Sequence, residues 1–117
     1  MSLLRALACL VLISCPVSAQ PLGPRGATGA SVDYHVHVKG DLTLEDALRR
    51  SRETGISYGI AINGGLSFPI NSDAGLEAFL REMHGKPVYT AFQAEGREWV
   101  RLFTRQTLEK FDYVFTD

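Results

Sequence analysis

The sequence predicts an α/β fold with parallel strands, in the form of the N-terminal half of a (β/α) barrel. From Val32 onward, apolar segments rich in β-formers alternate with segments that have helical periodicity. The strand-like segments begin at Val32, Tyr58, Val88 and Tyr113, so successive starts lie 26, 30 and 25 positions apart, as in βα units. The chain has 117 residues, whereas a complete (β/α)8 barrel takes about 200 or more. We therefore expect an incomplete domain.

Residues 1–19 have the features of an export signal. A short positive region precedes an almost unbroken apolar run, and Val17-Ser18-Ala19 places small residues at a cleavage site. We expect cleavage after Ala19 and a periplasmic or secreted protein. One alternative is a lipoprotein lipidated at Cys15, which Pro16 directly after the cysteine disfavours; another is an uncleaved, buried helix.

Composition excludes several classes of partner. Lys and Arg total 12 and Asp and Glu total 13, so the formal charge of −1 gives no electrostatic reason to expect a nucleic acid. No apolar run reaches the roughly 18 residues needed to span a bilayer, so no membrane span is expected. Both cysteines lie within residues 1–19, so the mature chain would have no disulfide. Its stability then depends on a hydrophobic core, with the possible help of a metal.

The domain is expected over residues 32–117, after a flexible linker rich in Gly and Pro at 20–31. The first strand is predicted over Val32 to Val38 and ends at the turn Lys39-Gly40-Asp41. A helix follows, with Thr43 as its N-cap and Gly55 as the residue after its last turn.

Two further βα units are expected. A second strand, Tyr58 to Ile62, is closed by Asn63-Gly64-Gly65, and the next helix is capped by Ser72 or Asp73. The third strand begins over Val88 to Phe92. Residues 99–111 are expected to be helical in part, with Thr104 as an internal cap, before a fourth strand begins at Tyr113.

The segment Asp33-Tyr34-His35-Val36-His37 carries the strongest chemical signal. Residues i and i+2 of a strand point to the same side, so His35 and His37 would present two imidazoles to one site. Neutral imidazoles are good ligands for Zn, Mn or Fe, and Asp33 could orient one of them. The alternative is a pair of hydrogen-bonded, inert histidines. The position at the C-terminal end of a parallel strand, where active sites of such folds gather, favours a metal.

Three other residues are candidates for the same site. Glu95 follows the third strand and could complete a metal site, or could instead be a solvated loop acid, as could Glu98. Arg97 could bind an anionic group of the substrate or pair with a nearby carboxylate. Asp117 ends the fourth strand and is a further candidate metal ligand.

These motifs resemble those of a known family. The opening of a PHP (polymerase and histidinol phosphatase) domain is similar to DYHVHVKGDLTLEDALRRSRETGISYGIAI, and later PHP motifs are similar to FQAEGREW and FDYVFTD. The resemblance implies a metal-dependent hydrolase, often a phosphoesterase, on a distorted barrel with several metal ions. By matching positions, it implies that His35, His37 and Glu95 are metal ligands.

The chain departs from the family at the second strand, which usually closes with an Asp-His pair. Asn63-Gly64 stands there instead, and an Asn is a poor ligand for Zn and cannot act as a general base. The expected function is an exported hydrolase that acts on a small, anionic molecule with metal-activated water. The alternatives are a binding module without catalysis, an inactive fragment, or a hydrolase of the amidohydrolase barrel type.

Overall fold

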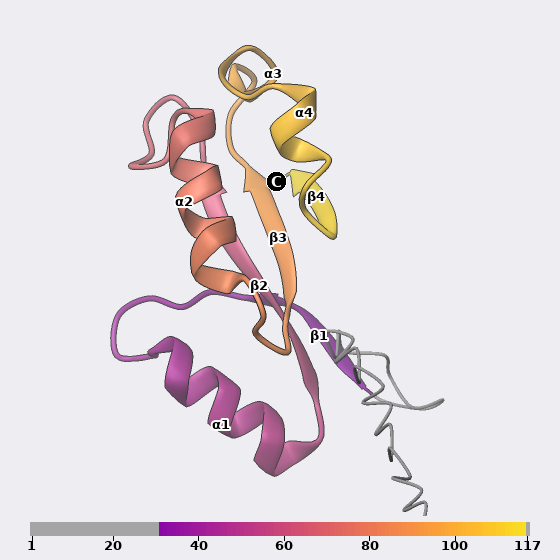
Figure 1. Ribbon diagram of the computed structural model, residues 1–117. Helices are drawn as coiled ribbons and strands as arrows, with labels where there is room; N and C mark the ends of the chain where they lie inside the picture. The colour runs from indigo at the N-terminus through magenta and orange to yellow at the C-terminus, as the bar shows by residue number, and fades with distance from the viewer. Residues whose placement is uncertain (1–30, 117) are drawn as a thin grey trace, which may run out of the picture.

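The computed structural model of the chain describes residues 31–116, which form a four-stranded parallel sheet with the strand order β1-β2-β3-β4 (Figure 1). The elements in chain order are β1 (Val32–Val36), α1 (Leu44–Thr54), β2 (Ser57–Gly64), α2 (Asp73–Met83), β3 (Tyr89–Ala94), α3 (Trp99–Leu102), α4 (Arg105–Leu108) and β4 (Tyr113–Thr116). The sheet is curled, consistent with part of an α/β barrel, so the predicted α/β class and parallel strand direction are confirmed. The predicted signal peptide, residues 20–30 of the linker, and Asp117 lie outside the described residues.

The predicted caps of α1 and α4 are present, whereas Ser72 stands at the N-cap position of α2 without a side-chain cap hydrogen bond. The Thr43 hydroxyl accepts a hydrogen bond from the Asp46 backbone N–H at 3.1 Å, and Gly55 follows α1 with a φ of 70°. The Thr104 hydroxyl caps α4 by accepting from the Thr107 N–H at 3.3 Å. An N-cap of this kind contributes about 1 kcal/mol to helix stability, which matters most for α4 because that helix has only 4 residues.

Strands β2 and β3 extend beyond their predicted ends. Their parallel pairing continues through Asn63↔Gln93 and Gly64↔Ala94, so the expected turn at Asn63-Gly64 is part of the sheet. A Cβ on Gly64 would lie 2.7 Å from the Phe92 ring, so a glycine is needed there for close packing. As a result, Asn63 and Gln93 stand side by side at the C-terminal edge.

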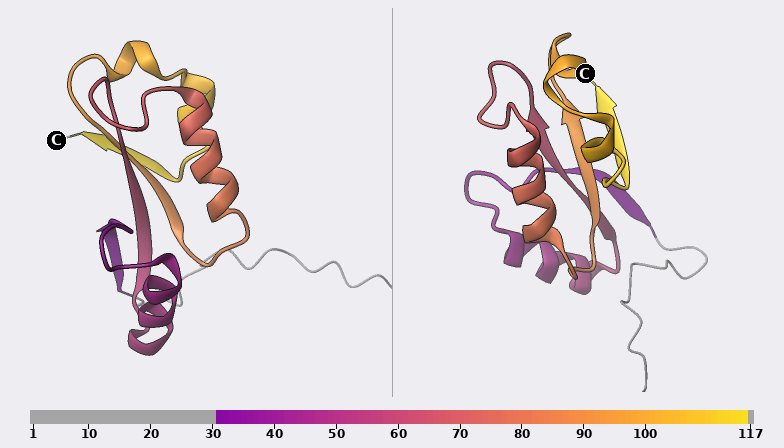
Figure 2. Two further views of the ribbon diagram at one scale, coloured as in Figure 1. Left: turned by 90° about the vertical axis from the view of Figure 1, so that its left-hand side faces the viewer. Right: turned by 45° about the horizontal axis from the view of Figure 1, so that its top comes forward.

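The hydrophobic core lies between one face of the sheet and the helices (Figures 1 and 2). Its largest fully buried side chains are Phe92 from β3, Ile60 from β2 and Leu76 from α2. Because side chains alternate between the faces of a strand, the residues next to Phe92 and Ile60 point to the opposite, concave face. No helix within residues 31–116 has the length and apolar character that a membrane crossing requires.

Aromatic rings gather on the concave face. Tyr34 lies edge-on to Tyr113 with ring centroids 5.5 Å apart, and Tyr113 stacks against Phe115 at 6.1 Å. The Tyr113 hydroxyl donates to the Tyr34 carbonyl, and burial raises the pKa of Tyr113 to about 12. A Cβ on Gly59 would overlap this hydroxyl, at 1.8 Å, so the ring occupies space that only glycine leaves open.

Candidate metal centre

The two histidines of the His-x-His motif meet a glutamine at the C-terminal edge of the sheet. The Nε2 atoms of His35 and His37 lie 3.0 Å apart, and each is 2.9 Å from Oε1 of Gln93. His35 belongs to β1, His37 lies directly beyond it, and Gln93 belongs to β3, two strands away. The two imidazoles therefore face the same place, as their spacing predicts.

Backbone features of β1 and β2 fix the two rings. The register of β1 against β2 shifts between Asp33 and Val36, an irregularity of the kind that re-aims side chains near active sites. The Nδ1 atom of His37 lies 2.9 Å from the Ala61 carbonyl oxygen. A carbonyl can only accept, so Nδ1 carries a proton there and Nε2 of the neutral ring presents a lone pair. Such an outer hydrogen bond is what orients a metal-binding histidine.

Hydrogen bonds cannot account for all three of these contacts at once. Each imidazole Nε2 is either a donor or an acceptor, the amide oxygen of Gln93 is an acceptor, and the amide nitrogen is a donor. Three mutual contacts among three such atoms always leave one pair of like groups facing each other, for every tautomer and for either amide orientation. A cation is different, because it can accept all three lone pairs at once.

The donor set also fits a divalent metal in chemistry and spacing. Three ligands at right angles in an octahedral site, about 2.1 Å from the cation, lie about 3.0 Å apart, close to the 2.9–3.0 Å separations of this cluster. Ligands of a tetrahedral zinc lie about 3.4 Å apart, so zinc would require a small outward movement of the three side chains. Gln93 is only 4% exposed, so its amide is held in place by packing. No three His, Cys, Asp or Glu side chains converge within residues 31–116; the third member of this cluster is a glutamine.

Within residues 31–116, Glu95 does not join His35 and His37 in a three-residue metal-binding group. Glu95 accepts a hydrogen bond from the Asn63 amide at 2.6 Å. Arg97 is exposed, and its backbone N–H donates to the Glu98 carboxylate at 3.2 Å. Asp117 lies outside the described residues.

Asp33 differs from its predicted role. Its carboxylate accepts from the His35 backbone N–H at 3.1 Å, so it supports the strand irregularity and not an imidazole ring. Gln93 was missed by sequence reasoning, although it stands two residues before Glu95 and therefore on the same side of β3. That spacing was the available signal.

A hollow of about 330 Å³ opens beside His37, between the segment after β1 and the segment after β2. Its lining includes Asn63, Lys39 and the side chains of Phe68, Pro69 and Ile70. It lies at the C-terminal ends of the strands, where ligands bind in open α/β sheets. It adjoins His37, and another hollow of about 270 Å³, lined by Tyr34, Tyr113 and Phe115, adjoins His35.

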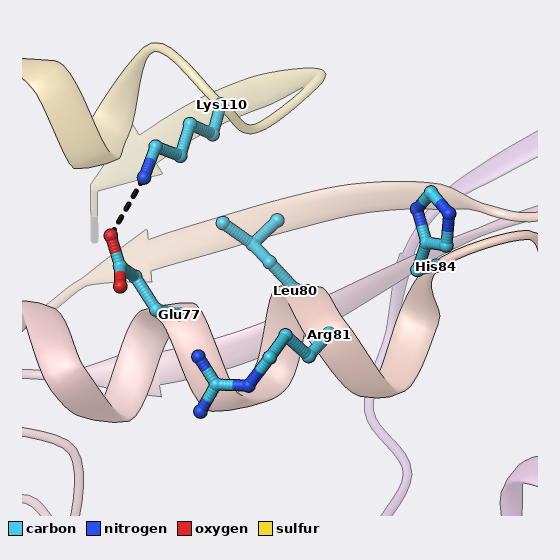
Figure 3. Close-up of a pocket in the computed structure, with 5 residues that line it drawn as sticks. All are labelled: Glu77, Leu80, Arg81, His84 and Lys110. Atoms are coloured by element: carbon cyan, nitrogen blue, oxygen red, sulfur yellow. Dashed lines mark hydrogen bonds and ion pairs between the residues drawn. The ribbon is translucent and has the colours of Figure 1, made fainter.

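Another hollow lies on the helical side of the molecule, where the side chains of α2 and Lys110 meet (Figure 3). Glu77 and Lys110 form an ion pair across it, with 2.6 Å between Oε1 and Nζ. His84 lines its far end and is exposed at the C-cap of α2. The ion pair already neutralises the lysine, and no histidine cluster adjoins this hollow.

Relatives of the chain were sought in three ways. Comparison with protein-family models, with curated proteins and with solved structures found no match. The resemblance to PHP domains therefore depends on the sequence motifs alone, and the assignment of a site depends on the geometry of His35, His37 and Gln93.

Proposed function

We propose that the chain functions as an exported, metal-dependent hydrolase of the PHP type, a phosphoesterase. His35, His37 and Gln93 would hold a divalent Zn, Mn or Fe ion. The observation that carries the proposal is the mutual 2.9–3.0 Å contact of their three donor atoms, not all three pairs of which can be hydrogen bonds at once. Glu95 as a further ligand and Arg97 as a substrate-binding group remain predictions from the sequence.

The residues of the site have separate tasks in this proposal. When bound, a divalent metal polarises a phosphoryl oxygen and lowers the pKa of water toward neutrality. The Ala61 carbonyl keeps the Nδ1 proton of His37 in place, so that Nε2 stays available as a ligand. The hydrogen bond from Asn63 holds the Glu95 carboxylate at the same edge of the sheet. The hollow beside His37 would bind the organic part of the substrate.

A binding module without catalysis is the second candidate. Asn63 stands where the related family has an Asp-His pair, and its amide is already bonded to Glu95 at 2.6 Å. A side-chain amide neither takes up nor releases a proton near neutral pH, so Asn63 cannot serve in general acid–base catalysis. This reading keeps the same metal and the same hollow, but predicts no turnover.

The two candidates separate in a combined metal and activity assay on the full chain. The chain is loaded with Zn, Mn or Fe, its metal content is measured, and hydrolysis of p-nitrophenyl phosphate is followed. The hydrolase predicts metal-dependent turnover that falls at least a hundredfold in His35→Ala and His37→Ala. His84→Ala is the matched control, because His84 is exposed on the helical side. Metal without turnover supports the binding module, and a chain that takes up no metal contradicts both.

A further inference from the structure

The hollow beside His37 combines an apolar wall with a single cationic side chain. Phe68, Pro69 and Ile70 supply apolar surface on one side, and His37 and Asn63 supply polar groups next to the histidine cluster. Lys39 is the only lysine or arginine in this lining. Ligand sites of small molecules have this composition, with mostly apolar walls and a few placed polar groups, and begin at about 300 Å³.

The Lys39 ammonium is available for a ligand. Within residues 31–116 it makes no ion pair or side-chain hydrogen bond, whereas Arg49, Arg105 and Lys110 each pair with a carboxylate. Its backbone is fixed by a turn in which the Leu42 N–H donates to the Lys39 carbonyl at 3.2 Å. The charge is thus presented from an ordered position two residues after His37.

The apolar wall is also formed in advance. The Gly65 N–H donates to the Ile70 carbonyl at 2.9 Å, and the Phe68 N–H donates to the Gly65 carbonyl at 3.1 Å. These two hydrogen bonds link the two ends and the middle of segment 65–70, so its backbone is fixed. Because this wall is already ordered, ligand binding does not incur the loss of conformational entropy that weakens binding to mobile loops.

We infer that this hollow binds the organic part of an amphipathic anion, the phosphate monoester of an apolar alcohol, with Lys39 holding its negative charge. This inference rests on the proposed function, because it places the phosphate between Lys39 and the histidine cluster. It assigns to Lys39 the substrate-binding role that the sequence predicts for Arg97. Lys39 is a positioning residue for the anion, and the apolar wall sets the preference for the alcohol.

Binding of two phosphonates to the metal-loaded full chain tests the inference by calorimetry. Hexylphosphonate and methylphosphonate have the same anionic head and differ in apolar surface. We expect hexylphosphonate to bind at least tenfold more tightly, and Lys39→Gln to weaken both about tenfold and to reduce the salt dependence of binding. Lys86→Gln is the matched control, since Lys86 precedes β3 at the opposite end of the sheet.

Equal affinity for the two phosphonates overturns the apolar part of the inference. Equal effects of Lys39→Gln and Lys86→Gln overturn the role of Lys39. Neither result contradicts the proposed function, which is tested by metal content and turnover. Conversely, a chain that takes up no metal but binds hexylphosphonate in a Lys39-dependent way contradicts the proposed function and keeps the hollow as an anion site.

Discussion

Replacement of Gln93 by leucine tests whether the three-atom cluster is built for a cation. In the metal-free chain, leucine removes one of the three mutually contacting atoms, and the remaining pair, His35 and His37, can form one ordinary N–H···N contact. The lost amide hydrogen bonds are then offset by the relief of the like-group contact and by an apolar side chain of similar size in a buried position. We expect the free energy of unfolding without metal to change by no more than about 1 kcal/mol.

The same substitution has a larger effect when metal is present. A ligand at a hundred times its Kd stabilises the folded state by about 2.7 kcal/mol, which for a domain of this size raises Tm by about 10–20 °C. Loss of even an outer partner of a ligand costs about 10–100-fold in affinity, so we expect Gln93→Leu to lose at least tenfold. At the same metal concentration, the stabilisation then falls to about 1.4 kcal/mol, and the rise in Tm falls by about half.

Thermal unfolding with and without Zn or Mn, followed by circular dichroism, measures both effects. Gln106→Leu is the matched control, because Gln106 is exposed on α4. A metal-induced rise in Tm that is the same in Gln93→Leu, Gln106→Leu and the unsubstituted chain refutes the assignment of Gln93 as a ligand. A loss of several kcal/mol in the metal-free Gln93→Leu chain refutes the claim that the cluster contains an unfavourable contact of like groups without metal.

Three further predictions concern the fold around the site. Gly65→Ala places a Cβ 2.5 Å from the Glu95 carbonyl oxygen, so we expect the free energy of unfolding in urea to fall by about 1–3 kcal/mol. A change below about 0.5 kcal/mol would show that the backbone around Gly65 shifts without cost and would contradict the prediction. Burial raises the pKa of Tyr113 to about 12, so the free energy of unfolding should fall as the pH rises from about 10, where an unfolded tyrosine ionises, through 12. Tyr113→Phe should weaken this alkaline loss of stability, and an unchanged dependence of stability on pH in that variant would contradict the prediction. The hydrogen bond from the Thr104 hydroxyl lowers the pKa of Asp73 below its ordinary 3.8, so the stability that this bond contributes is present above about pH 4 and is lost as the pH falls through the lowered value. In Asp73→Asn, the unfolding midpoint should therefore change less between about pH 5 and pH 2 than in the unsubstituted chain. Midpoints that fall in parallel in the two chains would argue against this role of Asp73.

The sequence alone was sufficient where a local pattern determines the structure. Thr43 and Gly55 mark the ends of α1 because capping and left-handed backbone are properties of single residues and their close neighbours. The strand ends were harder to predict, because Asn63-Gly64 has the composition of a turn but is held in the sheet by its pairing with Gln93 and Ala94. Pairing between strands depends on residues about thirty positions away, which local pattern does not show.

The site shows the same division. The His-x-His spacing predicted that His35 and His37 would face one place, and their Nε2 atoms do meet at 3.0 Å. The third partner required the register between strands, which places Gln93 beside Asn63 and brings its amide to the histidines. A search for acids alone favoured Glu95, whose carboxylate is bonded to Asn63 in the structure.

The metal centre is tested most directly by X-ray absorption spectroscopy of the full chain after loading with Zn and removal of excess metal. We predict one zinc per chain with scattering from two imidazoles, lost in the His35→Ala/His37→Ala double variant and retained in His84→Ala. A chain that retains no zinc, or a zinc whose imidazole scattering is unchanged in the double variant, would contradict the assignment of this cluster as a metal centre.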